Sequence, residues 1–230
     1  MSLFALSIVL IVVALILGLW AQFRVKSAFA KYAQVRISTD MTGADVAREI
    51  LAAANIRDVE VAEIDGLLGD HYDPSSKRLC LSSEVYRTPS VAAAGIAAHE
   101  TGHAIQHARG YAPLQARMAV VPITQFTSQA LPYIMFGGFF FHLIPGQLAV
   151  QLAALCYGVL TVFQLITLPV EFDASRRAKI ILGQMGIVQR GEEALGVDRV
   201  LNAAALTYLA AFVSSLGWLL YFLSLGNRRD

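Results

Sequence analysis

The chain has 230 residues, of which 56% are hydrophobic and only 15% are charged, and its formal net charge is +1. Since soluble domains have about 25% charged residues, this composition is not that of an ordinary soluble protein. The small net charge gives no large basic surface for nucleic acid, and Cys80 and Cys156 are too far apart in sequence to indicate a disulfide framework or a metal-binding cysteine pair.

Charged side chains are absent from three long stretches, residues 1–23, 118–170 and 200–227. The first and last are each long enough for one membrane-spanning helix of about 20 residues, and the middle one is long enough for two. Natural breaks in the middle stretch lie at Gly137-Gly138 and Pro145-Gly146. We therefore predict a mainly α-helical integral membrane protein with about four transmembrane helices.

The first apolar run, residues 3–20 within the predicted anchor 1–23, is interpreted as uncleaved. No basic residue precedes it and no A-x-A-like site follows it, which is unlike a signal peptide. Basic residues follow it directly at Arg24, Lys26, Lys31 and Arg36. By the positive-inside rule this side is cytoplasmic, so the amino terminus is expected outside.

Residues 24–117 form the one sizeable water-facing segment, and local patterns predict a small α+β domain there. A capping-box-like sequence from Thr42 to Asp45 begins a helix that is expected to end near Asn55. Alternating polar and apolar residues at 58–64 predict a strand. The sequence 71–82 then predicts a β-hairpin, with its tip at Asp73-Pro74-Ser75-Ser76.

The most informative stretch is His99-Glu100-Thr101-Gly102-His103, in an apolar helix that Ser90 begins and Gly110 ends. Residues four apart share one helix face, so His99 and His103 can bind the same zinc ion. Glu100 stands beside the first histidine, where it can hold a metal-bound water and take its proton. Burying a carboxyl and two imidazoles in a helix of Ala, Ile and Gly costs free energy, unless these groups are paired or bind a metal ion. The pattern therefore predicts a zinc hydrolase rather than a helix with a few satisfied polar residues.

Residues 118–140 and 147–168 are expected to form the second and third spans, joined by an outside loop around His142. We interpret His142 as a loop or interface residue. Polar residues at membrane depth, which we interpret as contacts between helices, are Gln125, Gln129, Gln151 and Gln164.

The chain is then expected to return to the cytoplasm, where basic residues follow the third span at Arg176, Arg177 and Lys179. Residues 171–202 are predicted to form a cytoplasmic helical segment with turns at Gly183, Gly186 and Gly191. Residues 203–230 are predicted to form the last transmembrane helix and a tail, whose Arg228 and Arg229 are a mild exception to the positive-inside rule.

A catalytic zinc needs a third protein ligand, on the same side of the membrane as the two histidines. Glu171 meets this condition, because it is expected at the start of a cytoplasmic helix that only a membrane hairpin separates from the metal-site helix. A carboxylate at a helix amino terminus is also favoured by the helix dipole. His107, His71 and Asp173 remain alternatives, although helical twist moves His107 around the face and one turn further along.

Three motifs carry a family resemblance: His99–His107, the turn His71-Tyr72-Asp73-Pro74, and Thr167–Ser175. Together with Ala203–Tyr208, they resemble the bacterial YugP-like neutral zinc metallopeptidases over nearly the whole chain. That family is similar in outline to the HtpX and CAAX-type membrane proteases, which pair H-E-x-x-H with a later glutamate and have a hairpin before the zinc helix.

The resemblance implies a zincin-like, gluzincin-type domain with one Zn²⁺ held by His99, His103 and Glu171, and with Glu100 as general base. One departure concerns the position four residues after the ligand glutamate. It is an aspartate in the wider group and Ser175 here, a weaker partner for an imidazole. Asp173 is expected to face elsewhere.

The resulting hypothesis is a zinc metalloendopeptidase of the bacterial inner (plasma) membrane, with its active site facing the cytoplasm. We expect protein or peptide substrates that are themselves membrane-associated, no nucleic acid partner, and an oligomeric state that the sequence leaves open. Besides the metal, donors to the oxyanion are expected among His71, His107, Arg176 and Tyr208. The edge of the hairpin, residues 71–81, can pair with an extended substrate backbone.

Two other classes compete with this hypothesis. A catalytically silent membrane scaffold or partner-binding protein with a structural zinc would need His71 or His107 as a fourth ligand, and it would have no use for Glu100. A small transporter built on the membrane glutamines would lack the intramembrane charge that usually marks a transport path. We therefore rank the peptidase first.

Overall fold

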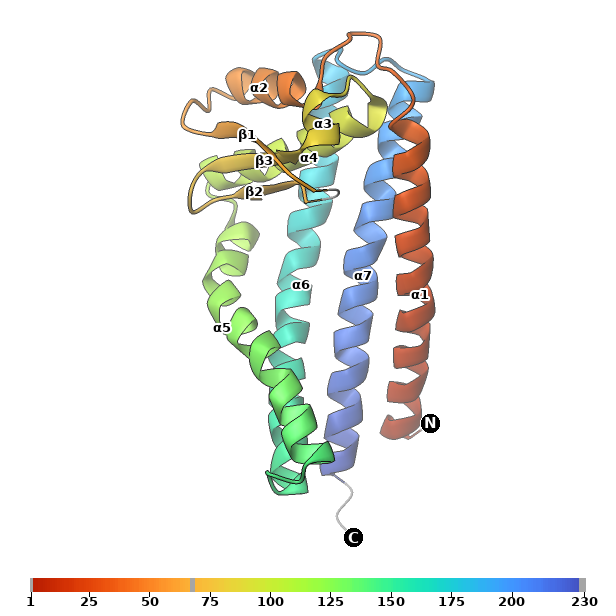
Figure 1. The fold of residues 1–230 in the computed structure, drawn as a ribbon, viewed down its shortest axis with the longest axis vertical. Coiled ribbons are helices and arrows are strands. Elements are labelled where there is room, and N and C mark those ends of the chain that lie inside the picture. Colours follow the sequence, from red (N-terminus) through yellow and green to blue (C-terminus); the bar gives the residue numbers. More distant parts are fainter. Residues whose placement is uncertain (1, 67–68, 228–230) are drawn as a thin grey trace. The chain divides into compact units, whose positions relative to one another are not determined.

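The computed structural model describes residues 2–66 and 69–227. The predicted tail beyond Asn227, and the centre of the turn between Gly66 and Gly69, lie outside the described residues. In chain order the elements are α1 (Leu3–Tyr32), α2 (Gly43–Ala53), β1 (Glu60–Ile64), β2 (His71–Asp73), β3 (Arg78–Ser82), α3 (Ser83–Arg87), α4 (Val91–Ala108), α5 (Ala112–Ile134), the π-helix η1 (Met135–Phe140), α6 (Gly146–Gln184) and α7 (Glu192–Gly226) (Figure 1).

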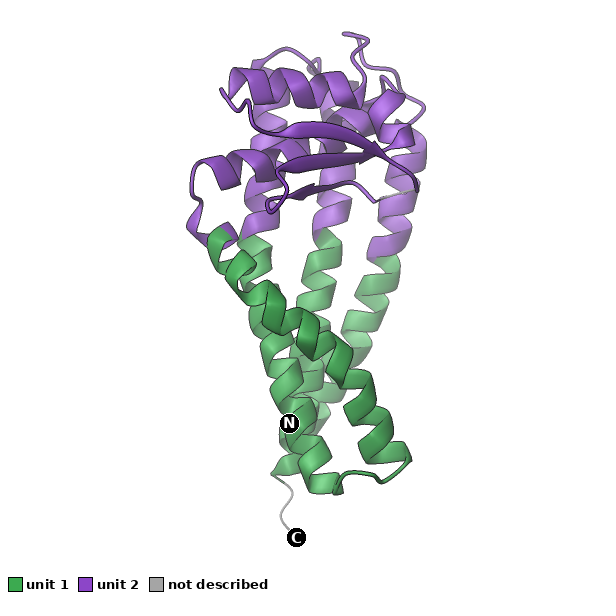
Figure 2. Cartoon of the chain, turned by 60° about the vertical axis from the view of Figure 1, so that its left-hand side comes forward, with its two compact units in different colours: residues 1–20, 115–169, 206–230 green, residues 21–114, 170–205 purple. Residues whose placement is uncertain are grey.

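The chain divides into two compact units, which Figure 2 colours green and purple. The first unit comprises residues 1–20, 115–169 and 206–230, and the second comprises residues 21–114 and 170–205. Helices α1, α6 and α7 contribute residues to both units, as does α5 with its first three residues. The second unit contains the sheet, the H-E-x-x-H motif and Glu171.

The sheet of the second unit has the strand order β1-β3-β2, which leaves β2 at one edge. Strand β1 pairs with β3 in parallel, and β2 pairs with β3 in antiparallel register, with Tyr72 opposite Leu79. The predicted strand and hairpin are thus confirmed. At the hairpin tip, the Asp73 carboxylate accepts hydrogen bonds from the backbone N–H of Ser75 at 2.8 Å and from the Ser76 hydroxyl at 2.6 Å, an arrangement that stabilises a tight turn.

Local capping interactions set the ends of α2 and α4 as the sequence predicts. Thr42 and Asp45 form the capping box of α2, and the Ser90 hydroxyl accepts from the backbone N–H of Ala93 to cap α4. Gly110 ends this stretch in a left-handed conformation, with a φ of 62° that favours glycine.

Helix α4 lies in the core of the second unit, where it packs against α2 and contacts β2 and β3. Its first half is a run of small residues that are almost completely buried, Val91, Ala92, Ala93, Ala94, Ala97 and Ala98. Because these side chains are short, neighbouring backbones can pack close to the helix. Helix α4 is therefore packed closely on several sides.

Three helices of the described residues are long and apolar enough to cross a membrane, α1, α6 and α7. Helix α5, with η1, covers the predicted second span 118–140 but is not among the three. It contains Pro122 and Pro132, and its serine, threonine and glutamine residues lower its hydropathy. Large apolar side chains are nevertheless exposed on it, such as Phe126 at 67% and Tyr133 at 78%, as on a lipid-facing surface.

Helix α6 corrects one expectation about the region after the third span. Pro169 lies inside α6, so Glu171 is in the middle of a long helix, and the argument that placed it at a helix amino terminus was wrong. The predicted segment 171–202 consists of the end of α6, a turn in which Gly186 and Gly191 have positive φ values of 66° and 108°, and the start of α7. Turns were predicted at both of these glycines, whereas Gly183, the third predicted turn position, lies inside α6.

Candidate metal centre

Three potential metal ligands converge in the second unit, two from α4 and one from α6. The Nε2 atoms of His99 and His103 lie 3.3 Å and 3.5 Å from Oε2 of Glu171. The ligand atoms of the three residues all lie within 4.8 Å of one another. Two atoms bound tetrahedrally to one zinc at about 2.1 Å would be about 3.4 Å apart. The two distances from Glu171 therefore match those that a single zinc ion needs.

Spacing within α4 explains why the two imidazoles meet. His99 and His103 are one helical turn apart, and their rings lie edge to face with centroids 4.8 Å apart. Both side chains are buried, as is Glu171, which is only 2% exposed. A buried carboxylate facing two imidazoles is a costly arrangement that a bound cation would neutralise.

The outward nitrogen of each imidazole has a polar partner of its own. The Ser175 hydroxyl lies 3.1 Å from Nδ1 of His99, and the Gln106 side-chain oxygen lies 3.0 Å from Nδ1 of His103. Each ring is thus held at Nδ1 while its Nε2 faces Glu171, the arrangement by which proteins orient metal-binding histidines.

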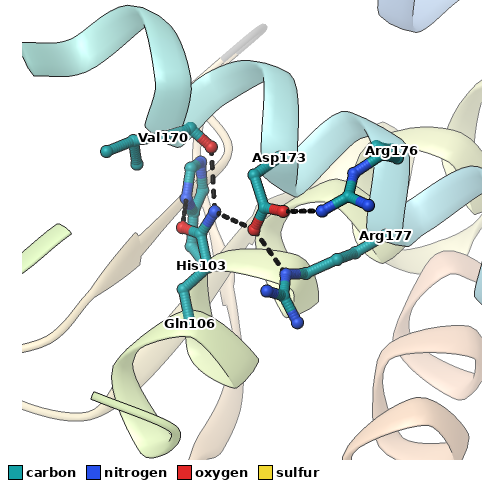
Figure 3. Close-up of polar contacts among 6 residues, drawn as sticks. All are labelled: His103, Gln106, Val170, Asp173, Arg176 and Arg177. Carbon is teal, nitrogen blue, oxygen red and sulfur yellow. Dashed lines mark hydrogen bonds and ion pairs between the residues drawn. The ribbon is translucent and has the colours of Figure 1, made fainter. Parts of the chain in front are cut away.

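Ser175, and not Asp173, faces Nδ1 of His99, and Asp173 reaches the site through Gln106. Its carboxylate accepts a hydrogen bond of 2.9 Å from the Gln106 side-chain amide, and it also pairs with Arg176 and Arg177 (Figure 3). Sequence reasoning missed Gln106 altogether. The available signal was a polar residue three positions after His103 on an otherwise apolar helix, and therefore on the same face.

Glu100 is buried, with 8% of its surface exposed. Burial raises the pKa of the Glu100 carboxyl, and Glu171 and Asp70 raise it further, while His99 and His103 oppose the shift. A carboxyl whose pKa is raised toward neutrality is suited to taking and returning a proton.

The other residues named from the sequence lie elsewhere. Nδ1 of His107 is 2.8 Å from the Tyr72 hydroxyl, and Nδ1 of His71 is 2.7 Å from the backbone oxygen of Gly69 on an exposed side chain. Arg176 pairs with Asp173, and Tyr208 belongs to the other compact unit. Among the described residues, His99, His103 and Glu171 are the one cluster of three or more histidine, cysteine or acidic side chains arranged to share an ion.

Comparison with known proteins agrees with the family resemblance of the sequence motifs. A family model described as "Putative neutral zinc metallopeptidase" matches residues 7–227. The chain is also similar to "Putative membrane protease YugP" of Bacillus subtilis (strain 168), with 44% identity over 227 residues that cover 98% of this chain and 99% of the relative. No solved structure matches the chain.

Proposed function

Because the chain belongs to the neutral zinc metallopeptidase family, we propose that it is an integral-membrane zinc metalloendopeptidase, with His99, His103 and Glu171 as ligands of one zinc ion and Glu100 as general base. The observation that carries this proposal is the convergence of the two Nε2 atoms on one oxygen of Glu171.

The chemistry of the donor set fits the proposed ion. Two imidazole nitrogens and one carboxylate oxygen form a ligand set that catalytic zinc sites use, and this set leaves a fourth position for water. Zinc bound there would lower the pKa of that water toward about 7 and polarise the scissile carbonyl.

Glu100 is assigned the proton transfers. As the residue after the first ligand, it is placed to hold the nucleophilic water, take its proton and later deliver that proton to the leaving amine. The raised pKa of its buried carboxyl supports this role, because a carboxyl with an ordinary pKa returns a proton less readily near neutral pH. Retention of this base argues against a purely structural zinc.

Strand β2 is the proposed binding place for the substrate backbone. It is an edge strand and it contacts α4, so an extended peptide can add to its free edge beside the metal helix. A cavity of about 330 Å³ that includes Tyr72, Ala104 and His107 in its lining adjoins both elements. This cavity is large enough for one substrate side chain.

The proposed setting is the inner membrane of a bacterial cell, with the active site on the cytoplasmic side. The basic residues that follow the first and third apolar stretches support this orientation. We include residues 118–140 as a fourth span, since the exposed aromatic side chains of α5 are suited to lipid. A site on that side would act on membrane proteins or their exposed segments.

The test measures zinc content and hydrolysis of labelled casein by detergent-purified protein for wild type, Glu171→Ala and Glu100→Gln, with the exposed Glu60→Gln as matched control. We expect about one zinc per chain in wild type, Glu100→Gln and Glu60→Gln, and loss of zinc in Glu171→Ala. Only wild type and Glu60→Gln should cleave casein. Full zinc content in Glu171→Ala would refute the ligand assignment, and bound zinc without hydrolysis in wild type would favour the structural-zinc scaffold.

A further inference from the structure

Gln106 is a completely buried residue of α4 that lies between a proposed zinc ligand and helix α6. Its side-chain oxygen is 3.0 Å from Nδ1 of His103. Its side-chain nitrogen donates to the backbone oxygen of Val170 and to the carboxylate of Asp173, both at 2.9 Å (Figure 3). Both the oxygen and the nitrogen of the Gln106 amide are therefore hydrogen-bonded.

These contacts determine which way the Gln106 amide points. Val170 offers a carbonyl and Asp173 a carboxylate, and both can only accept hydrogen bonds. Rotating the amide by 180° would bring its oxygen against these two acceptors and would leave the NH₂ group facing the imidazole. The orientation with the nitrogen toward α6 and the oxygen toward His103 follows from this donor and acceptor inventory.

The orientation of the amide in turn determines the tautomer of His103. An amide oxygen can only accept, so Nδ1 of His103 must carry a proton to bond with it. In the neutral imidazole the lone pair then stands on Nε2, the atom that faces Glu171. The proton on Nδ1 thus leaves the lone pair of Nε2 available to bind a metal ion.

Asp173 is fixed from its other side by two guanidinium groups. It pairs with Arg176 and Arg177, three and four residues further along the same helix. Helix α6 therefore presents a preset acceptor to the Gln106 amide. His99 has no comparable series of hydrogen bonds. Its partner, the Ser175 hydroxyl, can both donate and accept, so it does not determine the tautomer of His99.

We propose that Gln106 is the positioning residue that holds His103 as the Nδ1–H tautomer, and that Asp173 acts on His103 through the Gln106 amide. This inference deepens the proposed function, on which the meaning of the tautomer for zinc rests. The side-chain amide does here what a carboxylate in direct contact with a histidine does in other metal sites.

The first experiment reads the tautomer in the metal-free, full-length protein. Because the Glu171 carboxylate also offers an acceptor to Nε2 of His103, the tautomer is read in a Glu171→Ala background. ¹⁵N-labelled histidine resonances are recorded in detergent near pH 9, where a histidine without that carboxylate is neutral, and His103→Gln assigns the signal. We expect His103 to be the Nδ1–H tautomer when Gln106 is present, and the Nε2–H tautomer to appear when Gln106→Met is added, since Met keeps the side-chain length but has no amide. Observation of the Nε2–H form with Gln106 present would overturn the proposal.

The second experiment measures zinc affinity by competition with a chelator. Gln106→Met should weaken zinc binding by about 10–100-fold. Thr101→Val is the matched control, because it removes another buried hydrogen bond of α4, that of the Thr101 hydroxyl to the backbone oxygen of Ala97. We expect the control to bind zinc within about twofold of wild type, well below the effect of losing an orienting partner. Equal affinity of Gln106→Met and wild type would refute the inference.

Double variants separate an action through Gln106 from a general structural role. If Asp173 acts through the amide, Asp173→Ala should weaken zinc binding in wild type and have no further effect in Gln106→Met. Should Gln106→Met fail to fold, Gln106→Glu serves instead, and adding Asp173→Asn should recover affinity by restoring a donor to residue 106. Wild type that binds no zinc would refute the proposed function, while the tautomer measurement would still decide this inference.

Discussion

A Cβ atom on Gly102 would lie 2.9 Å from the carbonyl oxygen of Ala174 and 3.2 Å from its Cα atom. Helices α4 and α6 therefore pack backbone to backbone in the middle of the H-E-x-x-H motif. Ala174 is flanked by the residues that reach the histidines, Glu171 one turn before it and Ser175 directly after it. Glycine in this motif is thus the residue that lets α6 bring the third ligand to the other two.

Gly102→Ala should separate the two helices and weaken the metal centre. The added methyl group meets backbone atoms that cannot move aside cheaply, so we expect a loss of about 1–3 kcal/mol of stability together with reduced zinc content. Thermal unfolding in detergent and metal analysis measure both. Gly183→Ala in α6 is the control, because no atom lies within 4 Å of its added Cβ, and it should be neutral or stabilising by about 0.5–1 kcal/mol. Wild-type zinc content in Gly102→Ala would contradict the role given to this contact.

Ser175→Ala should have a smaller effect on zinc than Gln106→Met. It removes the hydroxyl 3.1 Å from Nδ1 of His99, but that hydroxyl does not determine the tautomer of the ring. We expect zinc affinity to fall by less than about tenfold, below the full range for loss of an orienting partner. Chelator competition with the two variants side by side gives the ranking. A larger loss in Ser175→Ala would mean that His99, not His103, is the more tightly controlled ligand.

Much of the second unit was predictable because short-range chemistry determines it. The capping box at Thr42 and Asp45, the Ser90 cap, the Asp73 turn and the four-residue histidine spacing are local patterns, and each appears in the structure. The same local reasoning also indicated Glu171, although one of its arguments was wrong.

The failures came from contacts between distant segments. A proline usually ends a helix, yet α6 continues through Pro169, and burial of its next residues, such as Val170 and Ala174, compensates for the lost hydrogen bond. The link from Asp173 to His103 passes through Gln106. Asp173 is 67 positions from Gln106 in sequence, and Gln106 is three positions from His103. A spacing rule for one helix can indicate the contact of Gln106 with His103 but not its contact with Asp173.

Tyr72→Phe should impair substrate handling and leave the metal centre intact. Burial raises the pKa of Tyr72 to about 12, with Asp58 and Asp73 adding to the effect, so its hydroxyl stays neutral and keeps its 2.8 Å contact with His107. This contact links the edge strand β2 to α4. We expect a higher KM for casein at unchanged zinc content. Tyr86→Phe, which loses a contact to Arg48, should leave the KM unchanged, and an equal rise in both variants would contradict the role of β2.

The capping box of α2 predicts a pH-dependent contribution to stability. Hydrogen bonds from the Thr42 hydroxyl, at 2.6 Å, and from the Thr42 backbone N–H lower the pKa of Asp45, aided by Arg48 and opposed by partial burial. A carboxyl with a lowered folded-state pKa stabilises the fold above its unfolded pKa of about 3.9, and this contribution disappears as the pH falls through the folded-state pKa.

Asp45→Asn should therefore unfold more readily than wild type at pH 7, and the difference should vanish as the pH falls below the folded-state pKa. Thr42→Ala, in contrast, also removes the acceptor of the Asp45 backbone N–H, so it should cost about 1 kcal/mol even in acid. Unfolding midpoints of the three proteins, measured from pH 7 down to about pH 1.5, test this contrast. A gap between wild type and Asp45→Asn that stays constant over this range would show that the charge of Asp45 does not stabilise α2.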